Sequence, residues 1–267
     1  MPGHNISAII LRRLAYSDYD FILDFLTDRG GKVSAIAKNA RKSKKRFAGI
    51  LEPFSCLEVV FVRPRKNAAG MFFLKEAFLT DPFAGIRNNY EKMVYASYWS
   101  EIINRWVEAE SRQAGLFPLF YHVLSALAAD DADCETLSLL FQIRFMALAG
   151  MSPDLSCCGV CRQGIEENCH GSNHEIVFDV SRGGLVCPGC RSTVIGSHQV
   201  EISRGTIKQL LWMQAGALQK AGRLRFTGAA RRQGLAVMEQ FVPYHLAAPI
   251  KSLEVLQNIR QWRRVKP

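Results

Sequence analysis

Long apolar runs are missing from the sequence, and no stretch approaches the roughly 18 residues that a membrane-spanning helix needs. The opening MPGHNISAIILRRL also lacks the basic start, long apolar segment and small-residue cleavage site of a signal peptide. With 48% hydrophobic residues, the 267-residue chain can still bury one large core or several smaller ones. These features predict a folded cytoplasmic protein whose eight cysteines stay reduced unless they hold metal.

Catalytic signatures are missing as well. The sequence has no Ser/His/Asp order and no paired-carboxylate site, and GTIKQLLW (205–212) lacks the glycine spacing and the lysine of a phosphate-binding loop. We therefore predict that the protein is not an enzyme and has no ATPase or nuclease activity. A metal-dependent or thiol enzyme stays open as an alternative, and it predicts turnover that is lost when Cys187 or Cys190 is replaced.

Lys and Arg outnumber the carboxylates at both ends of the chain. Residues 1–80 carry 14 Lys and Arg against 7 Asp and Glu, residues 81–190 carry 7 against 14, and residues 191–267 carry 13 against 3. The formal net charge of +10 thus comes from two basic blocks that flank an acidic middle. Two separate blocks suggest two surfaces for polyanions or acidic partners.

Five short apolar segments in the first 80 residues have the length and the flanking turns of β-strands. Five closely spaced strands with one long connection predict a small closed barrel. The five-stranded OB-fold is the commonest such barrel that binds single-stranded nucleic acid, although an SH3-like barrel would give nearly the same pattern. The predicted strands are ISAIILRR (6–13), DFILDFLT (20–27), KVSAIAK (32–38), FSCLEVVFV (54–62) and MFFLKEAFL (71–79).

From Asp81 onward, apolar residues recur at spacings of 3 and 4, which is typical of helices. An aromatic stripe in the first of these segments could stack bases, but its helical spacing favours a packed core. The stripe consists of Tyr95, Tyr98, Trp99 and Trp106. The predicted helices are 88–110, 116–130, 134–150, 203–218 and 234–246, followed by a short segment at 250–259.

Two CxxC motifs are the sharpest local signal: C-G-V-C at Cys158 to Cys161 and C-P-G-C at Cys187 to Cys190, with 25 residues between them. Two such turns can supply the four thiolates of a tetrahedral zinc ion, with Zn–S distances of about 2.3 Å. Four thiolates leave no position for water, so we predict one structural Zn²⁺ rather than a catalytic one.

Several alternatives to this metal site stay open. A redox dithiol at C-P-G-C would need a strand-to-helix context, which VFDVSRGGLVCPGC does not suggest. Cys56 and Cys134 stand alone in apolar runs and are expected to be buried. Four further residues could replace one of the ligands: Cys157, Cys169, His170 and His174.

The stretch KNARKSKKRFAG (38–49) places six basic residues in twelve positions without a carboxylate. It could be a solvated loop or a targeting patch, but its place between predicted strands favours nucleic acid. Cations would follow the phosphates, with a log–log salt slope of roughly −4 for six contacts, while Phe47 and Phe54 would stack bases on the same barrel face. The predicted DNA-binding residues are Arg12, Arg13, Lys38, Arg41, Lys42, Lys44, Lys45, Arg46, Arg63, Arg65 and Lys66.

The order ILRRLAYSDYDF, then FLTDRGGKVSAIAKNARKSKKRFAGILEPF, then two CxxC motifs in a helical C-terminal half resembles the bacterial recombination mediator family RecO, in its zinc-bearing type. The similarity spans nearly the whole chain and is most specific from Thr27 to Phe54. The doubled Cys157-Cys158 and the insert around Cys169 depart from the family pattern and leave the ligands of the first motif open.

This resemblance implies an N-terminal OB-fold, a helical domain and a zinc-finger module in which the metal is structural. It also implies binding to single- and double-stranded DNA and annealing of strands coated with single-stranded DNA-binding protein (SSB). Such proteins act with RecR, often with RecF, to load RecA onto coated strands in the bacterial cytoplasm, at the nucleoid. An RNA-binding maturation or translation factor is the second hypothesis, and it predicts tighter binding to RNA that depends on the 2′-hydroxyl.

The basic C-terminal block has its own expected partner. SSB proteins end in an acidic, apolar tail, and the resemblance implies that the helical half could accept it. A solvated helix face or a second DNA surface explains the same charge. The candidate tail-binding cations are Arg204, Lys208, Lys220, Arg223, Arg225, Arg231 and Arg232.

The predicted fold class is α+β and multidomain, with an OB-fold barrel followed by a helical domain into which a four-cysteine zinc module is inserted. The expected domains are a nucleic-acid-binding domain at 1–80, a first helical part at 81–150, the zinc module at 151–200 and a second helical part at 201–267.

Overall fold

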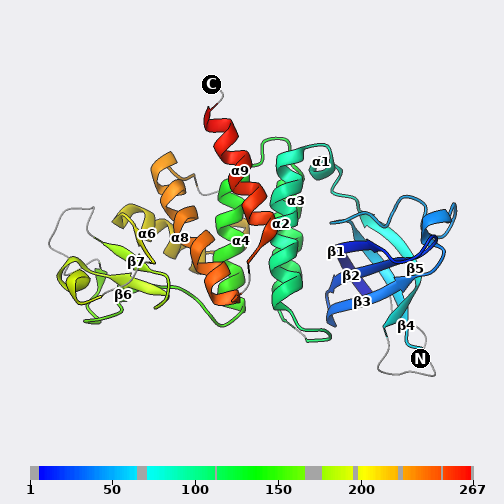
Figure 1. Cartoon of the computed structure of the whole chain (residues 1–267), viewed down its shortest axis with the longest axis horizontal. Helices are drawn as coiled ribbons and strands as arrows, with labels where there is room; N and C mark the ends of the chain where they lie inside the picture. The colour runs from blue at the N-terminus through cyan, green and yellow to red at the C-terminus, as the bar shows by residue number, and fades with distance from the viewer. Residues whose placement is uncertain are drawn as a thin grey trace. The chain divides into compact units, whose positions relative to one another are not determined.

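The computed structural model describes residues 6–64, 71–111, 113–165, 176–194, 198–221, 225–247 and 249–265 (Figure 1). The chain divides into two compact units, one formed by Met1–Asp130 with Ile250–Pro267 and the other by Asp131–Pro249. The end of the chain therefore returns to the unit in which the chain begins. None of the helices in these ranges combines the length and the apolar character that crossing a membrane requires.

The first unit opens with a closed five-stranded barrel. Strand β1 lies between β2 and β4, and the order around the barrel is β1-β2-β3-β5-β4. All neighbours are antiparallel except β3 and β5. This is a five-stranded OB-fold barrel, as predicted. Its strands are β1 (Ile6–Ala15), β2 (Phe21–Thr27), β3 (Gly31–Ala37), β4 (Cys56–Val62) and β5 (Phe72–Asp81).

Side-chain alternation explains the barrel core. In β3, every second residue from Gly31 to Ala37 is buried while the residues between them are half-exposed, as a strand with one face on a core requires. The core also takes in residues that do not belong to a strand. Ala40, Phe47 and Leu51 from the connection between β3 and β4 pack into the same cluster as Phe25 and Leu57. The long connection is thus anchored to the barrel.

The described residues of the first unit also form the helices α1 (Ala84–Arg87), α2 (Tyr90–Trp106), α3 (Leu116–Ala128) and α9 (Lys251–Val265). Helix α2 starts where the Asn89 side chain accepts a hydrogen bond from the N–H of Lys92. Tyr95, Tyr98 and Trp99 are fully buried, so the prediction of a packed core for the aromatic stripe is confirmed for these three residues. Helix α9 packs along α2.

The second unit has a helical core and a small sheet. Helix α4 (Cys134–Leu148) packs against α6 (Arg204–Ala215) and α8 (Gly228–Leu246). A Cβ atom on Gly234 of α8 would lie 3.2 Å from both terminal methyl groups of Leu139, so the absence of a side chain permits this close packing. The sheet has the order β6-β8-β7-β9. The remaining elements are β6 (Asp154–Cys158), β7 (Val177–Asp179), β8 (Gly184–Val186), β9 (Gln199–Glu201), the 3-10 helix η2 (Pro188–Thr193) and α7 (Leu218–Ala221).

The observed helices differ from the expected ones mainly at their ends. Helix α8 begins at Gly228 rather than at residue 234, because the Thr227 hydroxyl accepts a hydrogen bond from the N–H of Ala230 and caps the helix early. Helices α1 and α7 were not predicted, since four residues are too few to show a helical period.

Candidate nucleic-acid interface and metal centre

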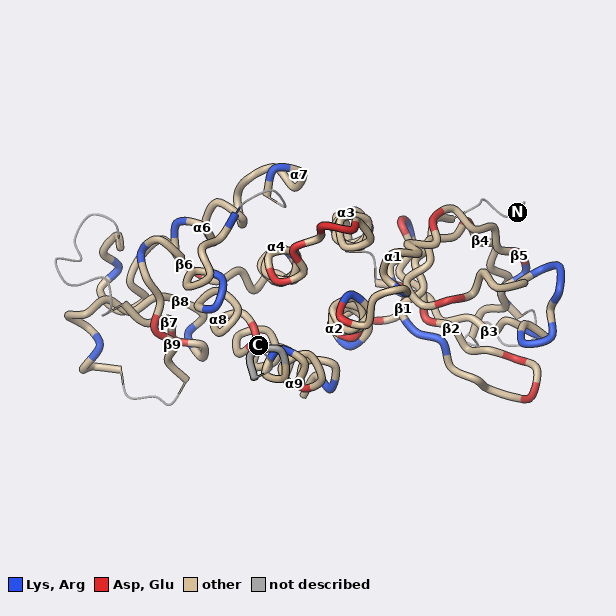
Figure 2. Tube along the Cα trace, turned by 90° about the horizontal axis from the view of Figure 1, so that it is seen from above, with Lys and Arg blue, Asp and Glu red and all other residues tan. Residues whose placement is uncertain are grey.

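Residues 38–49, here named the basic loop, leave the end of β3 and contain the 3-10 helix η1 (Ala40–Lys42). Ala40 and Phe47 point into the barrel core, and all six basic side chains are exposed. Figure 2 shows this part of the chain as a blue stretch on the barrel. Five of the six cations, from Arg41 to Arg46, thus lie between two apolar anchors, which limits the conformations that this charged segment can adopt.

Local contacts orient several of these cations. Arg46 donates to the carbonyl of Lys38 at 2.6 Å and lies over the ring of Phe47, 4.3 Å from its centre. The Nζ atom of Lys38 lies 4.8 Å from the ring centre of Phe73. These partners are carbonyls and aromatic faces. Within the described residues, no carboxylate forms an ion pair with any of the six cations, so their charge stays available to a polyanion.

Three of the other predicted DNA-binding cations are paired with carboxylates. Arg12 lies 2.7 Å from Asp24, Arg13 lies 2.6 Å from Glu52, and Arg63 pairs with Glu110. Arg65 and Lys66 lie outside the described residues. Pairing reduces the net positive charge at these three positions, so the basic loop is the strongest positive feature that the structure describes on the barrel.

Arg63 pairs with a carboxylate near the start of β3, whereas the basic loop leaves the end of that strand. Glu110, its partner, donates its backbone N–H to the carbonyl of Lys32, near the start of β3. The basic loop follows Ala37, at the other end of the strand. Among the described cations, Arg63 therefore has its partner away from the basic loop, and the contacts of all eleven predicted cations with DNA remain a prediction.

The predicted stacking role of Phe47 and Phe54 is wrong. Phe47 is 2% exposed and Phe54 is 5% exposed, so neither ring is open to a base. Phe47 fills the barrel core beneath the basic loop. Burying the two rings removes their apolar surface from water and so stabilises the fold, as is usual for phenylalanine.

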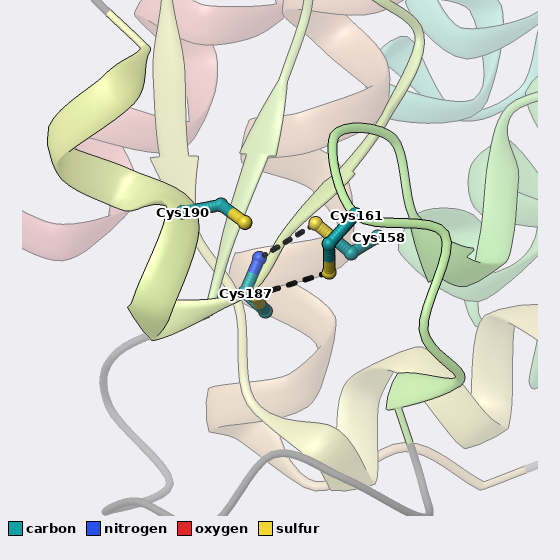
Figure 3. A group of neighbouring side chains, drawn as sticks. All are labelled: Cys158, Cys161, Cys187 and Cys190. Carbon is teal, nitrogen blue, oxygen red and sulfur yellow. Dashed lines mark hydrogen bonds between the residues drawn. The ribbon is translucent and has the colours of Figure 1, made fainter.

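The four predicted cysteine ligands come together. The sulfur atoms of Cys158, Cys161, Cys187 and Cys190 all lie within 4.8 Å of one another, and those of Cys161 and Cys187 are 3.8 Å apart (Figure 3). Sulfur atoms at the corners of a tetrahedron around zinc would be about 3.8 Å apart for Zn–S bonds of about 2.3 Å. The donor set and the spacing fit a metal ion of that kind, and four cysteines at this point could hold one.

Two tight turns place these sulfur atoms. In the first, the N–H of Arg162 donates to the carbonyl of Cys158 at 2.9 Å, and Arg162 adopts a positive φ of 62°. In the second, Cys187 follows β8 directly and the N–H of Cys190 donates to its carbonyl at 3.0 Å. The N–H of Gly159 donates to the carbonyl of Leu185 at 2.7 Å, which fixes the first turn beside β8.

The surroundings of Cys158 favour its thiolate form. Burial raises the pKa of this thiol, but hydrogen bonds from the N–H groups of Cys187, Cys161 and Val160 oppose burial and lower the pKa to about 6. Burial raises the pKa of Cys187 to about 12, and the neighbouring Cys190 thiol adds to this shift. Backbone N–H groups aimed at a thiolate are the usual outer contacts of a cysteine metal site.

The other cysteines separate from this group. The thiol of Cys157 turns toward Asp154, 3.4 Å from its Oδ2 atom, and so it is not one of the four clustered sulfurs. Cys169, His170 and His174 lie outside the described residues. Cys56 and Cys134 are buried, as predicted.

The redox alternative rested on sequence context, and that context differs from the expectation. Strand β8 ends at Val186, and the 3-10 helix η2 starts at Pro188, so C-P-G-C does follow a strand and open a short helix. The expected lack of a strand-to-helix context is therefore wrong. The convergence of two more sulfur atoms on the same point still favours metal binding over a two-cysteine redox site.

The described cations among the candidate tail-binding residues lie on α6, α7 and α8, except for Arg225, which precedes α8. Lys208, Lys220, Arg225 and Arg232 are exposed, whereas Arg204 is half-buried. Arg231 is also half-buried and pairs with Asp133 at 3.1 Å and with Glu135 at 2.7 Å. Arg223 lies outside the described residues. Contact of this set with an acidic tail remains a prediction.

Comparison with known proteins places the whole chain in one family. Residues 1–83 match the family model for the Recombination protein O N terminal, and residues 87–254 match that for the Recombination protein O C terminal. The chain is 52% identical over 263 residues to the DNA repair protein RecO of Desulfosudis oleivorans, covering 98% of this chain and 100% of that protein. It is 40% identical to the RecO protein of Desulfatibacillum aliphaticivorans and 32% identical to that of Syntrophus aciditrophicus, with at least 96% of each chain covered. The chain therefore belongs to the RecO family, and its role is in DNA repair and recombination.

Proposed function

We propose that the chain is a recombination mediator that binds single- and double-stranded DNA and anneals complementary strands coated with SSB. With RecR, and in some settings RecF, it would help to load RecA onto coated strands. The observation that carries this proposal is the basic loop, whose six exposed cations form no ion pair within the described part of the chain and are anchored to an OB-fold barrel.

The proposed mechanism is electrostatic. Two approaching strands repel each other through their phosphates, and a protein that neutralises both lowers this barrier while leaving the base edges free to pair. The contacts are provided by Lys38, Arg41, Lys42, Lys44, Lys45 and Arg46. Arg12, Arg13 and Arg63 contribute less because carboxylates already pair with them. No bond is made or broken, so the chain acts without catalysis.

In this proposal, Cys158, Cys161, Cys187 and Cys190 hold one structural Zn²⁺. When bound, the ion would join the turn after β6 to the turn after β8 and would supply no open coordination position. The role of the metal is then to hold the small sheet together rather than to bind a reacting group.

The experiment measures the annealing of labelled complementary oligonucleotides coated with SSB, at two salt concentrations. We expect the protein to accelerate annealing and the acceleration to fade as salt rises. Replacing Lys42, Lys44 and Lys45 with Glu should abolish the acceleration and weaken binding to DNA of every sequence. The matched control replaces Arg29, Arg182 and Lys251 with Glu, which changes the net charge by the same amount at exposed positions that are assigned neither to DNA nor to SSB. Equal behaviour of the two triple variants would refute the assignment of the loop.

We also propose that the second unit accepts the acidic tail of SSB through cations of α6, α8 and the segment between them. The exposed positions of Lys208, Lys220, Arg225 and Arg232 support this proposal. An excess of tail peptide should displace full-length SSB from the protein. An SSB complex that resists the peptide would eliminate tail docking and leave these cations as a second DNA surface.

An RNA-binding factor is the second candidate function, because an OB-fold with a basic loop suits either nucleic acid. Its signature would be tighter binding to an RNA oligonucleotide than to DNA of the same sequence.

A further inference from the structure

The loop between β1 and β2, residues 16–20, here named the tyrosine loop, exposes two tyrosine rings. Tyr16 is 62% exposed and Tyr19 is 43% exposed, although large aromatic side chains are usually covered. The turn that carries them is well defined. The Ser17 hydroxyl accepts hydrogen bonds from the N–H groups of Tyr19 and Asp20, and the N–H of Tyr16 donates to the Asp20 carbonyl at 3.1 Å. The rings are therefore displayed on a fixed turn.

This turn is joined to the basic loop. The backbone N–H of Arg41 donates to the carbonyl of Tyr19 at 3.0 Å, and its guanidinium donates to the carbonyl of Ser17 at 2.8 Å. The ammonium group of Lys42 lies 3.9 Å from the ring centre of Tyr19. Cations that can follow a phosphate backbone and rings that can stack bases thus lie side by side, in a geometry fixed before any ligand binds.

The start of β3, at the end of the strand away from the basic loop, is covered by residues from the end of α2 and the segment that follows it. Lys32, near the start of β3, donates to the carbonyl of Asn104 at 2.6 Å, and its own carbonyl accepts from the N–H of Glu110. Phe21, which follows the tyrosine loop, pairs with Ala37, which precedes the basic loop. Both loops therefore lie at the end of the β2–β3 pair where β2 begins and β3 ends. The segment that contacts Lys32 lies at the opposite end of the pair. The loop between the first two strands is a common ligand-binding element of OB-folds.

We propose that Tyr16 and Tyr19 form a base-stacking site for single-stranded nucleic acid, with the basic loop holding the phosphates on either side. This inference rests on the proposed function and adds the element that distinguishes single strands from duplex. Bases in a duplex are already stacked on one another, so the rings gain a partner only from unpaired bases. Asp18 and Asp20 are the two acids of the tyrosine loop, and the Asp20 carboxylate accepts the N–H of Asn39 at 2.8 Å. Six cations against two carboxylates leave the joined loops positive.

The test uses the full chain and three probes: an oligothymidylate, the same backbone with abasic sites, and a duplex. The double variant Y16A/Y19A should bind oligothymidylate about 5- to 150-fold more weakly than the wild type for each base that loses its stack. Its affinity for the duplex and for the abasic strand should stay unchanged, and so should the salt slope. Y16F/Y19F should bind like the wild type, because the rings remain. Y90A is the matched control, since Tyr90 is an exposed tyrosine on α2 of the same unit.

The outcomes separate this inference from the function on which it rests. The stacking site alone is overturned if Y16A/Y19A and Y90A bind oligothymidylate equally well while binding still depends on Lys42, Lys44 and Lys45. A loss that is equally large on the abasic strand or on the duplex also overturns it, because such a loss reports displacement of the basic loop. Failure of the wild type to bind any of the three probes overturns the proposed function together with the stacking site.

Discussion

Glu101 of α2 should control whether the last helix stays attached to its unit. The Oε2 atom accepts hydrogen bonds from the N–H and the hydroxyl of Ser252, at 2.9 and 2.6 Å, and Oε1 accepts the N–H of Lys251 at 3.3 Å and pairs with Arg105 at 2.7 Å. The carboxylate therefore caps the N-terminus of α9, where negative charge is favourable. Replacement by Gln removes the charge and turns an NH₂ group toward one set of these donors.

The cost of this replacement follows from the bonds that it weakens. Hydrogen bonds to a charged group contribute about 1.5–3 kcal/mol, and Gln keeps one accepting oxygen, so we expect a loss of about 2 kcal/mol, or roughly a 30-fold increase in the opening of α9. Hydrogen exchange of the amides in residues 251–265 measures this opening directly. Glu108→Gln is the matched control, because Glu108 is an exposed residue near the end of the same helix.

The pH dependence of α9 gives an independent check on the same residue. Burial raises the pKa of Glu101, but the hydrogen bonds from Ser252, Arg105 and Lys251 outweigh burial and lower it below the usual range. A depressed pKa means that the stabilisation is complete above the pKa of the unfolded chain and is lost as the pH falls through the folded value. Wild type and Glu101→Gln should therefore differ at neutral pH and converge in acid. Identical exchange of α9 in both proteins at pH 7 would refute the capping role.

Three further predictions follow from the contacts of single residues and of the metal centre. Phe47→Ala should destabilise the first unit by about 3–5 kcal/mol, measured by denaturant unfolding, because it empties a core position beneath the basic loop; a change below 1 kcal/mol would contradict the anchoring of that loop. Asp18→Asn should raise the affinity for DNA by less than tenfold at low salt and by less still at high salt, and an unchanged affinity at low salt would place the DNA away from residues 16–20. The purified protein should contain about one equivalent of zinc, and Cys157→Ser should retain it; loss of metal from that variant would mean that Cys157 is a ligand.

The sequence was sufficient for the barrel because its strands carry a strong signal. Each predicted strand overlaps the observed one, and β3 shows the period of two that one buried face imposes. The metal centre was predictable for a similar reason, since each CxxC motif places two sulfur ligands on one tight turn and the fold has only to bring two such turns together. In both cases, residues close in sequence carry the information.

Contacts between distant residues were out of reach. The burial of Phe47 depends on the barrel having room for one more ring from the basic loop, which no local pattern reveals. The pairing of Arg63 with Glu110 joins positions 47 residues apart. Tyr16 and Tyr19 were overlooked because exposed aromatic residues in a short loop have no periodic pattern. Their one local signal was the position of two tyrosines between two predicted strands.

The small sheet of the second unit indicates what the four clustered cysteines could contribute to the structure. Strands β7, β8 and β9 have three residues each, and so short a sheet is marginal on its own. One face is attached to α8, since Phe178 packs edge-on against Phe241 at 5.5 Å and His245 hydrogen-bonds to the Val180 carbonyl. The two cysteine turns lie beyond this support, at the end of β6 and the end of β8. A metal ion held by the four sulfur atoms would join these two chain segments, and four cysteine ligands would leave it no open coordination position.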